Sequence, residues 1–112
     1  MRRTHKYNAT KTEVDGIKFD SKAEAIRYKE LKLLESVGDI RGLELQPKYE
    51  LQEGFTHNGK RIRSINYVAD FFYFDKDGRK IVEDCKGVRT DVYLMKKKMF
   101  LKKYPDLTHI ET

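Results

Sequence analysis

The middle of the chain alternates apolar and polar residues with a period of two, which is typical of strands. Residues 43–51 follow this pattern and predict a half-buried strand, in which Pro47 indicates a sheet edge. Residues 61–74 form a longer run whose second half is apolar on both faces, as in a central strand. After a Gly-containing turn, residues 80–86 predict the next strand.

Two other stretches repeat their apolar residues at helical spacing. The first predicts a helix that is capped by Asp20 or Ser21 and runs to about Val37, before Gly38. The second predicts a helix over residues 92–104, which Pro105 ends. A right-handed crossover through this helix would place a last strand, residues 107–111, parallel to residues 80–86.

These elements predict an α/β fold, a mixed sheet with a helix on each face. The 112 residues are enough for one domain. Within it we expect a basic arm over residues 1–11, a hairpin over residues 12–19 around Asp15-Gly16, and a core over residues 20–112.

The charge balance favours a polyanionic partner, because 24 Lys and Arg residues face 18 Asp and Glu residues, a net charge of +6. The basic clusters supply the candidate nucleic-acid-binding residues Arg2, Arg3, Lys6, Arg61, Arg63, Lys96 and Lys98. A single cysteine excludes an internal disulfide, and no apolar run has membrane length, which predicts a cytoplasmic protein without a membrane partner. One cysteine and three scattered histidines give no zinc spacing.

Candidate chemistry lies in residues 67–86. If residues 67–74 are one strand, Asp70 shares a face with Val68, Phe72 and Phe74, and Asp84 and Lys86 share a face of the next strand. Acids on an apolar strand are costly unless a cation lies between them. The pattern predicts a metal-dependent, phosphodiester-cleaving site.

Mg²⁺ prefers hard oxygen ligands, which Asp70, Asp84 and the backbone carbonyl of Cys85 would supply. Lys86 would orient or deprotonate the attacking water or stabilise developing charge. The alternative is a cross-strand salt bridge on a solvated face. Glu83 is a competing ligand, although alternation turns it to the other face with Ile81 and Cys85.

Glu24 lies at the rim of the first helix's apolar arc and could complete the metal shell. Ser21 and Glu24 also fit the S-x-x-E capping box, in which the glutamate only satisfies a backbone N–H. Spacing leaves both roles open.

The ordered set of Glu24, Asp70, Asp84 and Lys86 resembles the PD-(D/E)xK nuclease superfamily. The segments FDSKAEAIRYKEL, GDIRGLELQP, YVADFFYF and VEDCKG, followed by a Lys-rich helix, resemble small phage proteins grouped with Holliday-junction resolvases and endonuclease-I-like enzymes. They are also similar to transposase nuclease subunits with a glutamate helix and a QP strand. The superfamily's proline before the first acid is replaced by Ala69.

This resemblance implies a restriction-endonuclease-like fold with an αβββαβ core, dependence on Mg²⁺ or Mn²⁺, and DNA cleavage. It implies that Asp70 and Asp84 are metal ligands, that Lys86 is the catalytic lysine and that Glu24 is the additional acid. It suggests a supporting role for Gln46. Lys97, inside an apolar arc, either reaches the site or extends its ammonium to solvent.

The first hypothesis is a structure-selective endonuclease that acts on branched DNA in phage replication or recombination. The resemblance implies a homodimer, in which the arm and hairpin could exchange between protomers. One alternative is a non-catalytic nucleic-acid-binding accessory protein on the same fold. Another is a nicking or restriction-type nuclease with sequence preference.

Overall fold

The computed structural model describes residues 11–85 and 87–112. The candidate residues Arg2, Arg3, Lys6 and Lys86 lie outside the described residues, so their predicted roles stay predictions. Among the helices of the described part, none is both long and apolar enough to cross a membrane.

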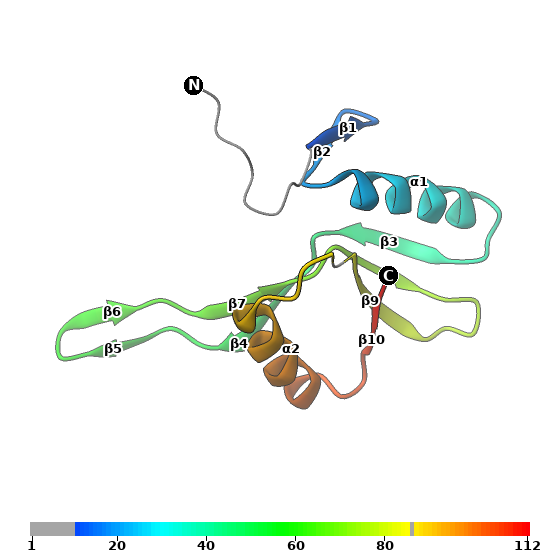
Figure 1. Ribbon diagram of the computed structural model, residues 1–112. Coiled ribbons are helices and arrows are strands. Elements are labelled where there is room, and N and C mark those ends of the chain that lie inside the picture. The colour runs from blue at the N-terminus through cyan, green and yellow to red at the C-terminus, as the bar shows by residue number, and fades with distance from the viewer. Residues whose placement is uncertain (1–10, 86) are drawn as a thin grey trace, which may run out of the picture.

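Figure 1 shows two helices and a series of short strands. In chain order they are β1 (Thr12–Val14), β2 (Ile17–Phe19), α1 (Lys22–Ser36), β3 (Arg41–Leu45), β4 (Lys48–Gln52), β5 (Phe55–His57), β6 (Lys60–Ile62), β7 (Ile65–Val68), β8 (Phe71–Phe74), β9 (Lys80–Asp84), α2 (Asp91–Lys103) and β10 (Thr108–Glu111). The predicted hairpin is present as the antiparallel pair of β1 and β2.

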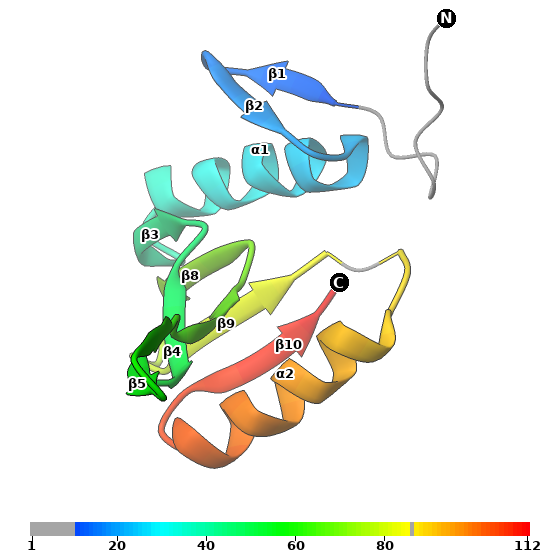
Figure 2. The same cartoon turned by 90° about the vertical axis from the view of Figure 1, so that its left-hand side faces the viewer.

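A four-stranded mixed sheet has the order β10-β9-β8-β3. β10 pairs parallel to β9, as the crossover rule predicts, and the other pairs are antiparallel. Helices α1 and α2 cover opposite faces of this sheet (Figure 2). The predicted α/β class is therefore confirmed.

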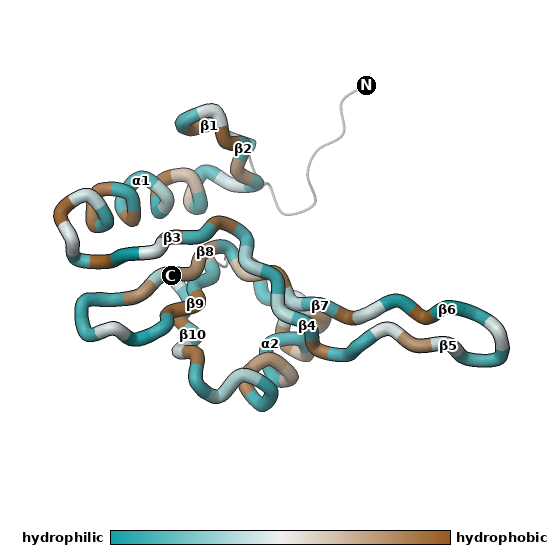
Figure 3. Tube along the Cα trace, turned by 180° about the vertical axis from the view of Figure 1, so that it is seen from behind, coloured by the Kyte–Doolittle hydropathy of each residue, from teal (hydrophilic) through white to brown (hydrophobic). Residues whose placement is uncertain are grey.

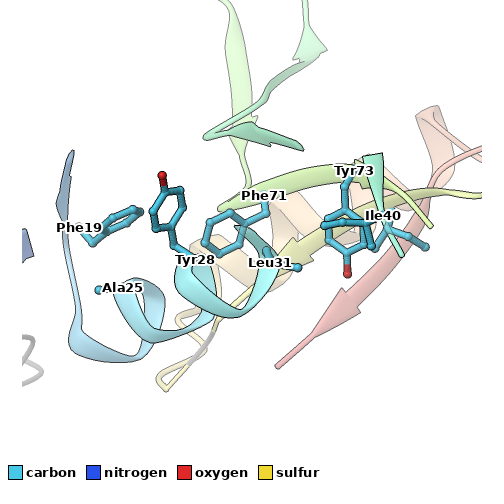
Figure 4. Packing of buried hydrophobic residues seen from close by; sticks show 8 residues of the cluster. Phe19, Ala25, Tyr28, Leu31, Ile40, Phe71 and Tyr73 are labelled. Atoms are coloured by element: carbon cyan, nitrogen blue, oxygen red, sulfur yellow. The ribbon is translucent and has the colours of Figure 1, made fainter. Parts of the chain in front are cut away.

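Each face of the sheet has its own apolar cluster. On the α1 face, Leu31 packs with Phe71 and Tyr73 (Figure 4), and Ile81 belongs to the same cluster. On the α2 face, the fully buried Phe100 packs with apolar residues of β7 and β9 and with Ala69. The central strands thus bury side chains on both faces, which explains the apolar run read from the sequence.

The prediction of two long uninterrupted strands was wrong. Residues 43–51 divide into β3 and β4 at Gln46-Pro47, and residues 61–74 divide into β6, β7 and β8. The break after β3 lies opposite the break after β7, because the Gln46 N–H donates to the Asp70 carbonyl (2.9 Å) and the Ala69 N–H to the Pro47 carbonyl (3.1 Å). Gln46 has a left-handed φ of 51°, and Pro47 has no N–H to give to a ladder. The two strands therefore bend together, and β3 forms the predicted edge of the sheet.

The bend changes which side chains share a face. Tyr67 and Ala69 pack on the α2 side, whereas Phe71, two residues further, packs on the α1 side. The prediction that Asp70 shares one face with Val68, Phe72 and Phe74 was therefore wrong, because alternation does not continue through residues 69–70. Asp70 lies at the bend itself, between β7 and β8.

Beyond β4 and β7 the ribbon continues as a second projection, the antiparallel pair of β5 and β6, which is called the arm from here on and is distinct from the predicted basic arm of residues 1–11. Figures 1 and 3 show the arm projecting from the two layers, with hydrophilic and hydrophobic residues mixed along it. All six residues of its two strands are exposed.

Candidate active site

The carboxyl ends of the parallel strands β9 and β10 face the same edge as the amino ends of α1 and α2 (Figure 2). The helix starts are capped by side chains, since the Ser21 hydroxyl accepts the Glu24 N–H and the Thr90 hydroxyl accepts the Tyr93 N–H, both at 3.1 Å. Helix amino ends carry partial positive charge, so this edge favours an anion.

Asp84 is the last residue of β9, and it is fully buried. Its Oδ2 atom accepts hydrogen bonds from the Tyr67 hydroxyl and contacts His109 Nε2 at 3.2 Å. The Tyr67 hydroxyl and His109 Nε2 are also 2.8 Å apart. Burial, followed by the hydrogen bond to Asp84, raises the pKa of Tyr67, so the phenol keeps its proton and donates. These contacts fix the orientation of the Asp84 carboxylate.

Sequence reasoning missed His109, because a lone histidine far along the chain gave no metal spacing. The signal that finds it is strand pairing: His109 on β10 is the partner of Val82 on β9. Paired residues of neighbouring strands share a face, so His109 lies on the Asp84 side of the sheet.

Asp70 meets Asp84 at the bend. The Asp70 backbone N–H lies 3.1 Å from Asp84 Oδ1 and 3.2 Å from the Glu83 carbonyl. The Asp70 side chain points to the same strand, where its Oδ2 accepts the Cys85 N–H at 2.7 Å. The two acids predicted as metal ligands are therefore brought together at the end of β9.

Glu24 belongs to the same neighbourhood. Its backbone N–H is capped by Ser21, as the capping motif predicts, but its side chain is inside the protein, with only 5% of the residue exposed. The pKa of the Cys85 thiol is raised to about 11, first by burial and then by the negative charges of Asp70, Glu83 and Glu24, against an opposing hydrogen bond with Thr112. Glu24 and Asp70 thus both lie close enough to act on Cys85, and the thiol is protonated at neutral pH and is no nucleophile.

Glu83 faces the other side of β9, as alternation predicts. This fully buried carboxylate accepts two hydrogen bonds from Arg27, at 2.6 and 3.1 Å, one from the Tyr73 hydroxyl at 2.7 Å and one from the Thr112 hydroxyl at 3.0 Å. The hydrogen bond to Glu83 raises the pKa of Arg27, so the Arg27 guanidinium stays charged. These four hydrogen bonds use Glu83 to attach α1 to the sheet. This supports ranking Glu83 below Asp84 as a metal ligand.

The supporting candidates Gln46 and Lys97 reach the acid pair through other groups. Gln46 is exposed, and the contact that links it to the site is its backbone N–H at the bend. Lys97 pairs with Glu111 at 3.3 Å, and Glu111 also binds Arg89. Tyr93 donates to Glu111 at 2.5 Å, and its pKa is raised first by burial, then by this hydrogen bond and then by the charge of Asp84. Lys97 thus pairs with Glu111, the residue of β10 that lies opposite Asp84 in the strand register.

The described basic candidates occupy two surfaces. Arg61, within the arm strand β6, and Arg63, directly after it, are exposed. Lys98 is exposed on α2 and Lys96 is half-buried there.

Within residues 11–85 and 87–112, no three His, Cys, Asp or Glu side chains are grouped so as to hold a metal ion. The donor chemistry of Asp70, Asp84 and Glu24 nevertheless fits Mg²⁺, which binds carboxylate oxygens and retains several waters. A carboxylate oxygen has two lone pairs, so one oxygen can accept a backbone N–H and also coordinate a cation. The predicted contribution of the Cys85 carbonyl stays a prediction. The backbone contact seen at Cys85 is the hydrogen bond from its N–H to the Asp70 carboxylate.

The fold and the site define an α/β protein with a linked pair of acids at the carboxyl end of a mixed sheet. A family model described as protein of unknown function (DUF1064) matches residues 4–111, and the chain belongs to this family. No curated protein and no solved structure matches the chain.

Proposed function

We propose that this protein is a metal-dependent DNA endonuclease that hydrolyses phosphodiester bonds. The observation that carries the proposal is the linked acid pair, in which the Asp70 N–H contacts Asp84 Oδ1 and the Asp70 carboxylate accepts the N–H of the residue after Asp84. Two acids that meet at the end of one strand bring two negative charges into a partly buried site, and a bound cation offsets the cost of placing them there.

The order of elements supports a restriction-endonuclease-like fold. The core follows α1-β3-β8-β9-α2-β10, which is the αβββαβ order implied by the resemblance, with β10 parallel to β9. The acid positions also follow that resemblance, with Glu24 on α1, Asp70 before β8 and Asp84 at the end of β9.

Each residue has a role in this proposal. Asp70 and Asp84, with Glu24 beside them, would hold Mg²⁺ or Mn²⁺, which when bound supplies charge neutralisation at the phosphoryl group and an acidified water. Tyr67 and His109 orient Asp84. The amino ends of α1 and α2 favour the phosphate of the scissile strand. Lys86, outside the described residues, is the proposed catalytic lysine.

The proposed substrate is branched DNA, and a homodimer would make paired cuts. The net charge of +6 supports a nucleic-acid partner, and the exposed arm residues Arg61 and Arg63 offer phosphate contacts. A role in phage replication or recombination and a cytoplasmic location rest on the resemblance and on the composition.

One observation favours a second candidate, a non-catalytic DNA-binding accessory protein. Within the described residues, no group of three metal-ligating side chains forms. Such a protein would use the same basic surfaces and would bind DNA without cutting it.

The test is cleavage of labelled four-way junction, linear duplex and single-stranded DNA with Mg²⁺, with Mn²⁺ and with chelator. Wild type should cut the junction only with metal, and Asp70→Asn should remove the cutting while keeping the circular dichroism spectrum. Asp106→Asn, which removes an exposed acid, is the matched control and should cut normally. Metal-dependent cutting of all substrates alike would keep the enzyme and refute selectivity. Binding without cutting in every condition would refute the endonuclease and leave the accessory protein.

A further inference from the structure

A second feature lies on the α2 side, away from the acid pair. Between α2 and β4 there is a pocket of about 580 Å³, lined by Leu51, Lys98, Met99, Lys102 and Lys103. This volume falls within the range of small-ligand sites. Three of the five lining residues are lysines and none is an acid, so the pocket suits an anionic occupant.

The pocket combines an apolar part with a basic part. Leu51 is buried and Met99 is half-buried, and both belong to the apolar cluster under α2. Lys98, Lys102 and Lys103 are all exposed. Lys98 and Lys102 are four residues apart on the helix, a spacing at which like charges repel, and a bound anion relieves this repulsion.

The elements that line the pocket also lead to the β5–β6 arm and to the edge of the acid pair. Leu51 is on β4, which leads into the arm through Gln52. At the other end, α2 begins at Asp91, at the sheet edge where β9 ends (Figure 2), and seven helical residues of 1.5 Å rise place Lys98 about 10 Å along the axis from that start. The pocket is therefore joined to the β5–β6 arm through β4 and to the edge of the acids through α2.

We infer that this pocket binds one unpaired nucleotide of a DNA strand, with the base against Leu51 and Met99 and the flanking phosphates on the lysines. A base within a duplex is stacked and paired, so it would have to leave the helix to enter such a pocket. Apolar contact with the face of a base tolerates any sequence, whereas lysines contact the backbone. The inference rests on the proposed function for its choice of DNA, and it adds that the preferred DNA contains unpaired nucleotides near the cut.

DNA binding is measured with chelator present, so that no cleavage occurs. The readout is the fluorescence anisotropy of a labelled eight-nucleotide oligo(dT) and of the same strand with a central abasic site. We expect Lys98→Ala with Lys102→Ala to weaken oligo(dT) binding by about tenfold through lost phosphate contacts. Lys18→Ala with Lys29→Ala removes the same charge from exposed positions elsewhere and should change the affinity by less than about twofold.

The base contact is tested with Met99→Ala, whose circular dichroism and melting are compared with wild type. Wild type should bind the intact strand more tightly than the abasic strand, and Met99→Ala should lose this preference. Equal wild-type binding of the two strands would overturn the inference. Binding of polyglutamate as strong as that of oligo(dT) would also overturn the inference, in favour of an acidic protein partner.

The two proposals fail separately. If no substrate is cut with any metal while the abasic strand is still discriminated, the endonuclease proposal falls and the pocket inference holds. If the junction is cut normally by the Lys98 and Lys102 double variant and no base preference is found, the pocket inference falls alone.

Discussion

The contact between Arg27 and Glu83 gives the sharpest test of how α1 is attached to the sheet. Arg27 reaches across from α1 and makes two hydrogen bonds to the fully buried Glu83 of β9. The change to make is Arg27→Met, which keeps the apolar stem and the helix propensity and removes the charge. Among the described residues, Glu83 then keeps the hydroxyl donors of Tyr73 and Thr112.

The expected loss follows from the burial of each partner. Removing one partner of a fully buried ion pair costs about 3–5 kcal/mol. The Arg27 side chain is 24% exposed, so water screens the pair in part, and two hydroxyl donors remain. We therefore expect the free energy of unfolding to fall by about 2–3 kcal/mol, which lowers the urea midpoint by about 1–2 M for a small domain.

The assay is urea unfolding followed by far-ultraviolet circular dichroism. Arg27 also contacts Glu30 at 3.1 Å on the surface, so Glu30→Ala is the control and should cost less than about 1 kcal/mol. The double variant Arg27→Met with Glu83→Leu should lose less than the sum of the single variants, because no buried charge is left without a partner. A loss below about 0.5 kcal/mol for Arg27→Met would refute the reasoning.

Three further predictions concern stability. Hydrogen bonds from Arg89 and other donors hold the pKa of Glu111 at about 2, below its ordinary value of 4.5, so the stabilisation is complete above pH 4.5 and is lost as pH falls towards 2. Urea midpoints at pH 5 and pH 3 should differ less for Glu111→Gln than for wild type, and an unchanged difference would contradict this. Ser21→Ala removes the cap of α1 and should cost about 1 kcal/mol in urea unfolding, whereas an unshifted midpoint would show that the cap contributes nothing. Gly42→Ala should cost about 1–2 kcal/mol, since φ is +68° and the new Cβ would lie 3.1 Å from a ring on β8, while Gly87→Ala meets no atom within 4 Å and should be nearly neutral; equal thermal midpoints would contradict it.

The helices and the crossover could be predicted from the sequence because their signals are local. Ser21 caps α1 as predicted, and the parallel pairing of β10 with β9 follows from chain handedness. The faces of Glu83 and Cys85 also followed from alternation, because β9 is regular through this region. In each case the deciding interactions lie within a few residues of one another or obey a general rule of connection.

The bend and the partners of Asp84 could not be predicted in the same way. Gln46 is not a residue type that favours a left-handed φ, so only Pro47 indicates an interruption, and a proline there predicts a sheet edge rather than a bend. The alternation of residues 61–74 continued through Asp70 in the sequence although the strand does not. His109 comes near Asp84 through strand pairing across 25 residues, which no local pattern records.

The bend accounts for the acid pair. In a straight strand the Asp70 N–H would face a single ladder carbonyl, whereas here it is shared between the Glu83 carbonyl and Asp84 Oδ1. The left-handed φ of Gln46 lies directly across this point, joined to it by the bond from the Gln46 N–H to the Asp70 carbonyl. A costly backbone conformation thus coincides with two neighbouring carboxylates, and strain of this kind concentrates where a protein holds groups for function. The supporting role of Gln46 stays a prediction, and its backbone lies at the bend where Asp70 meets Asp84.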